Sequence, residues 1–117
     1  MKSTCVLLSL GLALASAALA RDLPDLVSEC EACHGPGGVS SEQDVPSLAG
    51  NSVIYLREML DQFYNYERHC ETTTYRHGDR ARTPMSMCNV ASSLSEDEKQ
   101  ALAEYFANAA LPAEASD

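Results

Sequence analysis

Apolar side chains recur at helical spacing in three stretches of the chain, each bounded by residues that start or stop helices. The first stretch begins at Leu23 behind Asp22, a suitable N-cap, and ends at the helix-breaking run Gly35–Gly38. The second follows Asn51 and places four side chains on one face, namely Val53, Leu56, Leu60 and Phe63. These patterns predict one helix over about residues 23–34 and another that begins after residue 51.

The third stretch has the clearest start signal. Ser95 followed by Glu98 is a capping box in an acidic first turn, which suits the positive end of the helix dipole. Leu102, Tyr105 and Phe106 mark its predicted buried stripe. Residues 39–50 and 64–82 lack a clear period, and no strand pattern of useful length occurs. We therefore predict an all-α fold with about three main helices.

Residues 1–20 have the pattern of a cleaved secretory signal peptide. Lys2 is the only charged residue among them, an apolar stretch runs from Val6 to Leu14, and Ala18-Leu19-Ala20 is a suitable cleavage site. The apolar stretch is too short to span a bilayer. We expect export to the periplasm without membrane insertion, and a single mature domain over residues 21–117 with a frayed tail at 111–117.

The mature chain is small and acidic. Cleavage of the 117-residue chain removes Lys2 and leaves seven basic residues against 17 acidic ones, and there is no tryptophan. A chain of this size holds one domain with a thin core, which excludes multidomain enzymes and membrane channels. The acidic balance argues against nucleic-acid binding, because phosphate contacts need a basic face.

The run Cys30-Glu31-Ala32-Cys33-His34 is C-x-x-C-H, the attachment signature of a c-type haem. Two cysteines three residues apart on a helical turn can each form a thioether to a vinyl group, and the adjacent histidine can bind the iron. Redox dithiols and zinc sites share the C-x-x-C spacing but do not require the histidine. We therefore expect one covalent haem c on Cys30 and Cys33, with His34 as an axial iron ligand.

The sixth iron ligand has three candidates, Met59, Met85 and Met87. Thioether sulfur is the soft ligand that raises a haem potential. Met59 lies within an amphipathic helix, where packing is the usual role of methionine. Met85 and Met87 both lie in the loop before the last helix, and loop chemistry alone does not choose between them.

The chain resembles the bacterial class I cytochromes c from about residue 26 to 108. The residues that carry the resemblance are Cys30–His34, Pro46–Gly50, Tyr55-Leu56 and Met87–Ser95. It implies a small class I cytochrome c fold around one haem. It also selects Met87 as sixth ligand, since Met85 falls two residues out of the family register.

The same resemblance implies two further contacts around the haem. The carbonyl of Pro46 is expected to accept a hydrogen bond from Nδ1 of His34, which would orient the imidazole ring. Leu48 is expected to pack on the haem. With His34 and Met87 as ligands, the iron would carry electrons rather than bind a substrate.

Within that family, the chain is similar over residues 47–68 to the haem subunit of flavocytochrome c sulfide dehydrogenase. The shared residues are Leu48-Ala49-Gly50, Tyr55-Leu56, Phe63 and Arg68. Well-known members carry two haem domains in that subunit, whereas this chain has one. The similarity implies a subunit that is not catalytic alone and accepts single electrons from a sulfide-oxidising flavoprotein, which holds FAD.

Three other functions are kept as alternatives. The first is a free periplasmic carrier that serves an oxidase or a reductase. The second is a small peroxidase, which would need an open sixth position and a distal base such as His69 or His77. The third is a haem sensor or metal-handling module that uses the arginine- and histidine-containing insertion at residues 68–82.

Cys70 and Cys88 remain once the haem cysteines are assigned. We predict a disulfide between them, which closes a loop worth about 3 kcal/mol by the chain-entropy argument. Because Cys88 follows Met87, this bond would hold the ligand loop in place. A copper or zinc site that uses Cys70 or Cys88 with His69 and His77 is the alternative.

Three arginines, Arg76, Arg80 and Arg82, form a basic segment in the acidic chain. A solvated loop, contacts to haem propionates and docking to a redox partner are all compatible with it.

Overall fold

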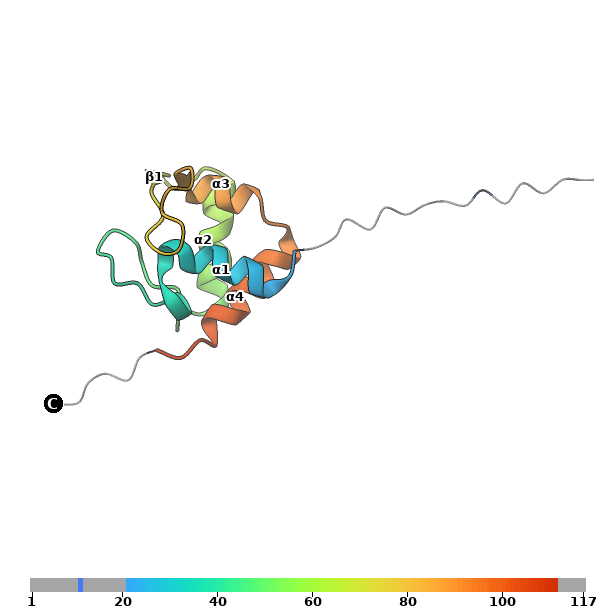
Figure 1. Cartoon of the computed structure of the whole chain (residues 1–117). Helices are drawn as coiled ribbons and strands as arrows, with labels where there is room; N and C mark the ends of the chain where they lie inside the picture. The colour runs from blue at the N-terminus through green and yellow to red at the C-terminus, as the bar shows by residue number, and fades with distance from the viewer. Residues whose placement is uncertain (1–10, 12–20, 112–117) are drawn as a thin grey trace, which may run out of the picture.

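A computed structural model describes residue 11 and residues 21–111 (Figure 1). The regular elements are α1 Leu23–His34, η1 Pro36–Gly38, α2 Val53–Tyr64, β1 Thr72–Thr73, β2 Met85–Ser86, α3 Met87–Ser92 and α4 Glu96–Ala107. The predicted all-α fold is confirmed. The predicted signal peptide lies outside the described residues except for Gly11, as does the predicted tail beyond Leu111.

The predicted helix boundaries are close to those observed, and side-chain caps fix two of them. Ser95 accepts a hydrogen bond from the Glu98 amide while the Glu98 carboxylate accepts one from the Ser95 amide, so the predicted capping box is present at α4. Ser52 caps α2 through the Tyr55 amide. Asp22 occupies the N-cap position of α1, but its side chain makes no capping hydrogen bond.

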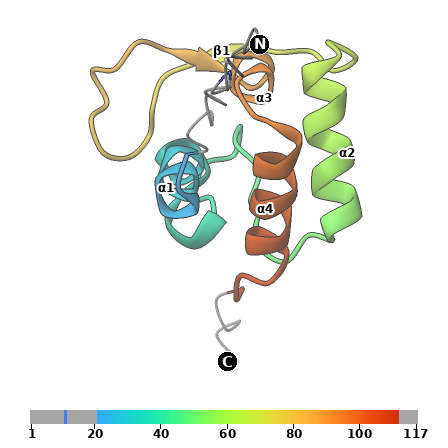
Figure 2. The ribbon, with the colours of Figure 1, turned by 90° about the vertical axis from the view of Figure 1, so that its right-hand side faces the viewer.

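The core lies where α4 packs between α1 and α2, as Figure 2 shows. Its central side chains come from four segments and are Leu26, Val27, Leu56, Leu94, Leu102, Ala103 and Phe106. The predicted stripe of α4 is partly wrong, because Tyr105 is 42% exposed, although its ring packs perpendicular to that of Phe106. Phe106, the next residue along the helix, is 2% exposed and belongs to the core cluster, so Tyr105 lies at the edge of the buried face.

The stretch before α4 is more ordered than its sequence indicates. Residues 87–92, expected to be loop, form α3, which begins at the N-cap Ser86 and buries Cys88 and Ala91. Strands β1 and β2 pair antiparallel and are only two residues long, too short to leave an alternating pattern. The disulfide Cys70–Cys88, with its Cα atoms 5.7 Å apart, lies just outside this pair of strands.

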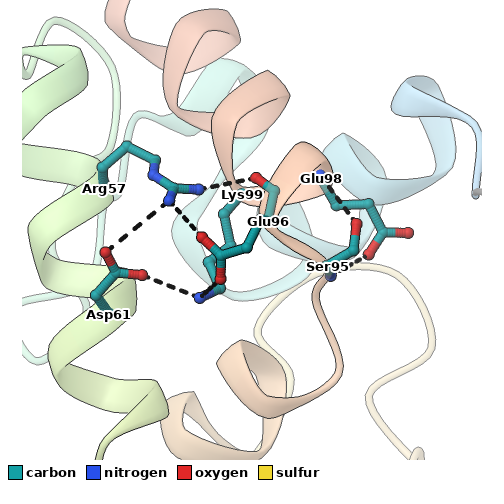
Figure 3. Close-up of polar contacts among 6 residues, drawn as sticks. All are labelled: Arg57, Asp61, Ser95, Glu96, Glu98 and Lys99. Carbon is teal, nitrogen blue, oxygen red and sulfur yellow. Dashed lines mark hydrogen bonds and ion pairs between the residues drawn. The ribbon is translucent and has the colours of Figure 1, made fainter.

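A buried lysine joins α2 to α4 (Figure 3). Lys99 is 1% exposed, and its Nζ lies 2.9 Å from Asp61 and 2.6 Å from Glu96. Its ammonium group also lies over the ring of Tyr64, 4.4 Å from the centroid. Because both carboxylates reach solvent, the lysine stem fills core space while its charge stays compensated.

Candidate functional site

Cys30 and Cys33 lie one turn apart near the end of α1, and both are free thiols. The Cys30 side chain packs against the core, and this burial, with the negative charges of Glu29 and Glu31, raises its pKa to about 12. Burial also raises the pKa of Cys33, which lies nearer the surface. The structure therefore keeps two unpaired cysteines side by side in a chain whose other two described cysteines are joined.

His34 is the last residue of α1, and its imidazole is buried. Its Nδ1 lies 2.6 Å from the carbonyl oxygen of Pro46. Burial lowers the pKa of His34, and the hydrogen bond to Pro46 only partly opposes this effect. A neutral ring that donates from Nδ1 has its other nitrogen, Nε2, available to bind a metal.

A glycine turn sends the chain from His34 into the loop that carries Pro46. Gly35 has φ 87° and ψ 160°, a conformation open only to glycine, and its amide closes the helix by donating to Glu31. The loop returns to the helices where the Leu48 amide donates to the Gly38 carbonyl at 2.7 Å. Leu48 is half-buried and packs against the core cluster.

The two methionines near α3 lie in different elements. Met85 belongs to β2 and pairs with Thr73, whereas Met87 is the first residue of α3. Both side chains are half-buried, so burial does not separate them. Met59 lies on α2, where the guanidinium of Arg68 contacts its sulfur. Met87 stands between the N-cap Ser86 and the disulfide cysteine Cys88.

The arginine-rich insertion, residues 68–82, packs against the C-terminal turn of α1 that carries Cys30 and Cys33. The amides of Arg76 and His77 both donate to the carbonyl of Ala32, each at 2.9 Å. This part of the insertion is not wholly solvated, because Tyr75 is only 4% exposed. The sequence gives no signal for this contact, since Ala32 is a small residue far from the insertion along the chain.

The residues of the alternative metal site are not brought together. The disulfide occupies both Cys70 and Cys88. His69 is exposed beside Glu71, while Nε2 of His77 is buried without a hydrogen-bond partner among the described residues. Within residues 21–111, no cluster of three or more histidine, cysteine, aspartate or glutamate side chains could hold a metal ion.

The donors at the end of α1 fit a c-type haem. Two free thiols on one helical turn match two thioether bonds, and His34 offers a neutral nitrogen whose ring is already oriented by a backbone carbonyl. A tetrahedral zinc site would need two more ligands beside Cys30 and Cys33, and the described residues supply no such set. Of the described helices, none is long and apolar enough to cross a membrane.

Comparison with known proteins gives one family and two relatives. The sequence profile of the family described as Cytochrome c matches residues 22–110. A protein of Stutzerimonas stutzeri (strain A1501) named "Thiosulfate dehydrogenase electron acceptor" is 40% identical over 83 residues, which cover 70% of this chain and 33% of the relative. A protein of the same name from Thiomonas intermedia (strain K12) is 26% identical over 91 residues, or 77% of this chain and 36% of the relative. The chain thus spans about a third of the length of each relative.

Proposed function

The chain belongs to the cytochrome c family, and from this premise we propose that it is a periplasmic electron-transfer domain with one covalent haem c. The observation that carries the proposal is the pair of free thiols followed by a histidine whose Nδ1 is held by Pro46. When bound, haem c takes up and releases single electrons. The domain would not be catalytic alone.

Each residue of the site has a proposed role. Cys30 and Cys33 would form the thioethers, and His34 and Met87 would be the axial ligands. The carbonyl of Pro46 fixes the tautomer and the orientation of His34, because Nδ1 must carry the proton that it donates. Leu48 would cover the haem with an apolar surface.

The disulfide supports the choice of Met87. It ties Cys88, the next residue, to Cys70 at the far end of the insertion. The Ser86 hydroxyl fixes the other side of Met87 by capping α3. A methionine held on both sides loses little freedom when its sulfur binds iron, which favours it over Met85 in a two-residue strand.

Visible spectroscopy of the purified protein tests the site. We expect a low-spin spectrum with a weak far-red sulfur-to-iron band, and a haem that remains bound to the polypeptide after denaturation. Met87→Ala should abolish the far-red band, and Met85→Ala should leave it unchanged. Loss of the band in Met85→Ala instead would overturn the ligand assignment, and a high-spin wild-type spectrum would overturn the electron-transfer proposal.

We propose an enzyme that oxidises an inorganic sulfur compound as the electron donor. The names of the two relatives favour a thiosulfate dehydrogenase. The similarity of residues 47–68 to the haem subunit of flavocytochrome c keeps a sulfide-oxidising flavoprotein with FAD as the second candidate. Mixing the ferric protein with each enzyme and its substrate distinguishes the two donors. We expect rapid reduction with thiosulfate and its dehydrogenase, and a faster reaction with the flavoprotein and sulfide would reverse the order.

A further inference from the structure

The carbonyl of Ala32 lacks its helical partner for a reason visible in the sequence. In a continuing helix it would accept from the amide of residue 36, but residue 36 is proline and has no N–H. The amides of Arg76 and His77 take its place, both at 2.9 Å. The insertion therefore completes the end of α1 between the two cysteines of residues Cys30–His34, here called the attachment turn because haem is proposed to bind there.

The Arg76 side chain also joins the insertion to the loop that carries Pro46, through ion pairs with two residues of that loop. Its guanidinium donates to both carboxylate oxygens of Asp44, at 3.2 and 2.7 Å, and to Glu42 at 3.1 Å. A fourth hydrogen bond, of 2.9 Å, goes to the hydroxyl of Thr73. Forked arginine–carboxylate pairs are among the stronger polar contacts, and the Arg76 side chain is only 19% exposed.

A second arginine fixes the far end of the same stretch. Arg82 donates to Glu29 of α1 at 2.7 Å, and its guanidinium lies 4.1 Å from the centroid of the buried Tyr75 ring. Arg80 lies between the two anchored arginines. It is exposed and makes no ion pair with any residue that the structure describes. Two arginines thus hold the segment on the attachment turn, and a third offers a matched control.

We propose that residues 72–86, here called the cover segment, shield the haem edge at Cys33 from solvent, and that Arg76 is the positioning residue that holds them there. This inference rests on the proposed haem at Cys30 and Cys33. Arg76 and Arg82 are thus neither solvated nor free for docking, because their carboxylate partners belong to the same chain. The cover segment decides how closely a small reagent or a redox partner can approach this edge.

Hydrogen exchange and reduction kinetics test the inference in the mature haem protein. In Arg76→Gln, we expect the amides of residues 76 and 77 to exchange about tenfold faster or more, because a charge-assisted contact is lost. Ferric Arg76→Gln should also be reduced by ascorbate several-fold faster. Ascorbate is an anion, so loss of a positive charge alone would slow the reaction.

Arg80→Gln is the matched control, because it removes one positive charge from the same segment and leaves the ion pairs of Arg76 and Arg82 in place. It should leave both rates near wild type, and Asp44→Asn should give a smaller increase because Glu42 still binds Arg76. Equal behaviour of Arg76→Gln and Arg80→Gln would overturn the inference. Absence of covalent haem would overturn the proposed function instead, and the exchange measurement would still report on the cover segment.

Discussion

Two ionic clusters of similar composition perform different tasks in the two halves of this molecule. The long helices α1, α2 and α4 are here called the helical frame, and in it Lys99 joins α2 to α4 through Asp61 and Glu96. Beside the attachment turn, Arg76 joins two loops through its ion pairs with Asp44 and Glu42. The first cluster lies on regular elements that an apolar core already holds together, whereas the second joins segments without regular structure.

The difference shows where single polar contacts decide a structure. The helical frame has seven clustered buried side chains, so its geometry would survive the loss of one ion pair. The loops contribute few buried apolar side chains, chiefly Val45 and Tyr75. Their positions therefore depend on glycine turns, the disulfide and the arginine contacts. We expect substitutions in the frame to change stability, and those in the loops to change the site.

The largest effect should come from Gly35→Ala, which acts at the junction of the two regions. A Cβ at this position would overlap the carbonyl oxygen of Val39, in a backbone conformation that other residues avoid. We expect a loss of about 3 kcal/mol or more in unfolding free energy, and a disturbed His34–Pro46 contact. Urea unfolding and the haem spectrum measure the two consequences.

Gly37→Ala is the control for this prediction. Gly37 also has a positive φ, 67°, but its Cβ would point into open space. It should cost only about 1 kcal/mol and leave the spectrum unchanged. Equal losses in the two variants would show that the overlap with Val39 is unimportant.

An intermediate effect is expected from Lys99 in the frame. Lys99→Ala should cost about 2 kcal/mol, less than a fully buried pair would, because Asp61 and Glu96 can return to water. Lys99→Met should cost less than half of that, since it keeps the buried stem. Both variants should retain the wild-type midpoint potential. A changed potential would contradict the division into frame and loops.

The smallest effect concerns pH and Glu98. Its pKa is lowered to about 2, first by the hydrogen bond from Arg21 and then by that from the Ser95 amide. A lowered folded-state pKa stabilises the protein above the unfolded value of about 4.3 and ceases to do so as the pH falls towards 2. Because Arg21 is half-exposed, we expect about 1 kcal/mol, seen as a stability difference between wild type and Glu98→Gln that shrinks from pH 5 to pH 2.5. A constant difference would refute this role for Glu98.

The sequence was sufficient to locate the three long helices and the attachment turn. Their signals are local, because Ser95 and Glu98 are three residues apart and Gly35 directly follows His34. The contact between His34 and Pro46 was expected only from family resemblance. No local pattern could place a proline carbonyl against a histidine ring twelve residues away.

The features that the sequence did not predict depend on residues far apart in the chain. Lys99 has the character of a surface residue, and its burial follows from Asp61 on another helix. The partners of Arg76 lie more than thirty positions earlier, in a loop without a period. Helix α3 was missed because six residues are too few to show a helical repeat.

The partly buried thiol of Cys30 bears on the order in which the protein would be assembled. Its side chain packs against the core, and burial together with the charges of Glu29 and Glu31 raises its pKa to about 12. A protonated thiol is a poor nucleophile, so we expect the proposed thioether at Cys30 to form before α1 has packed against the core. Haem attachment would then come before folding.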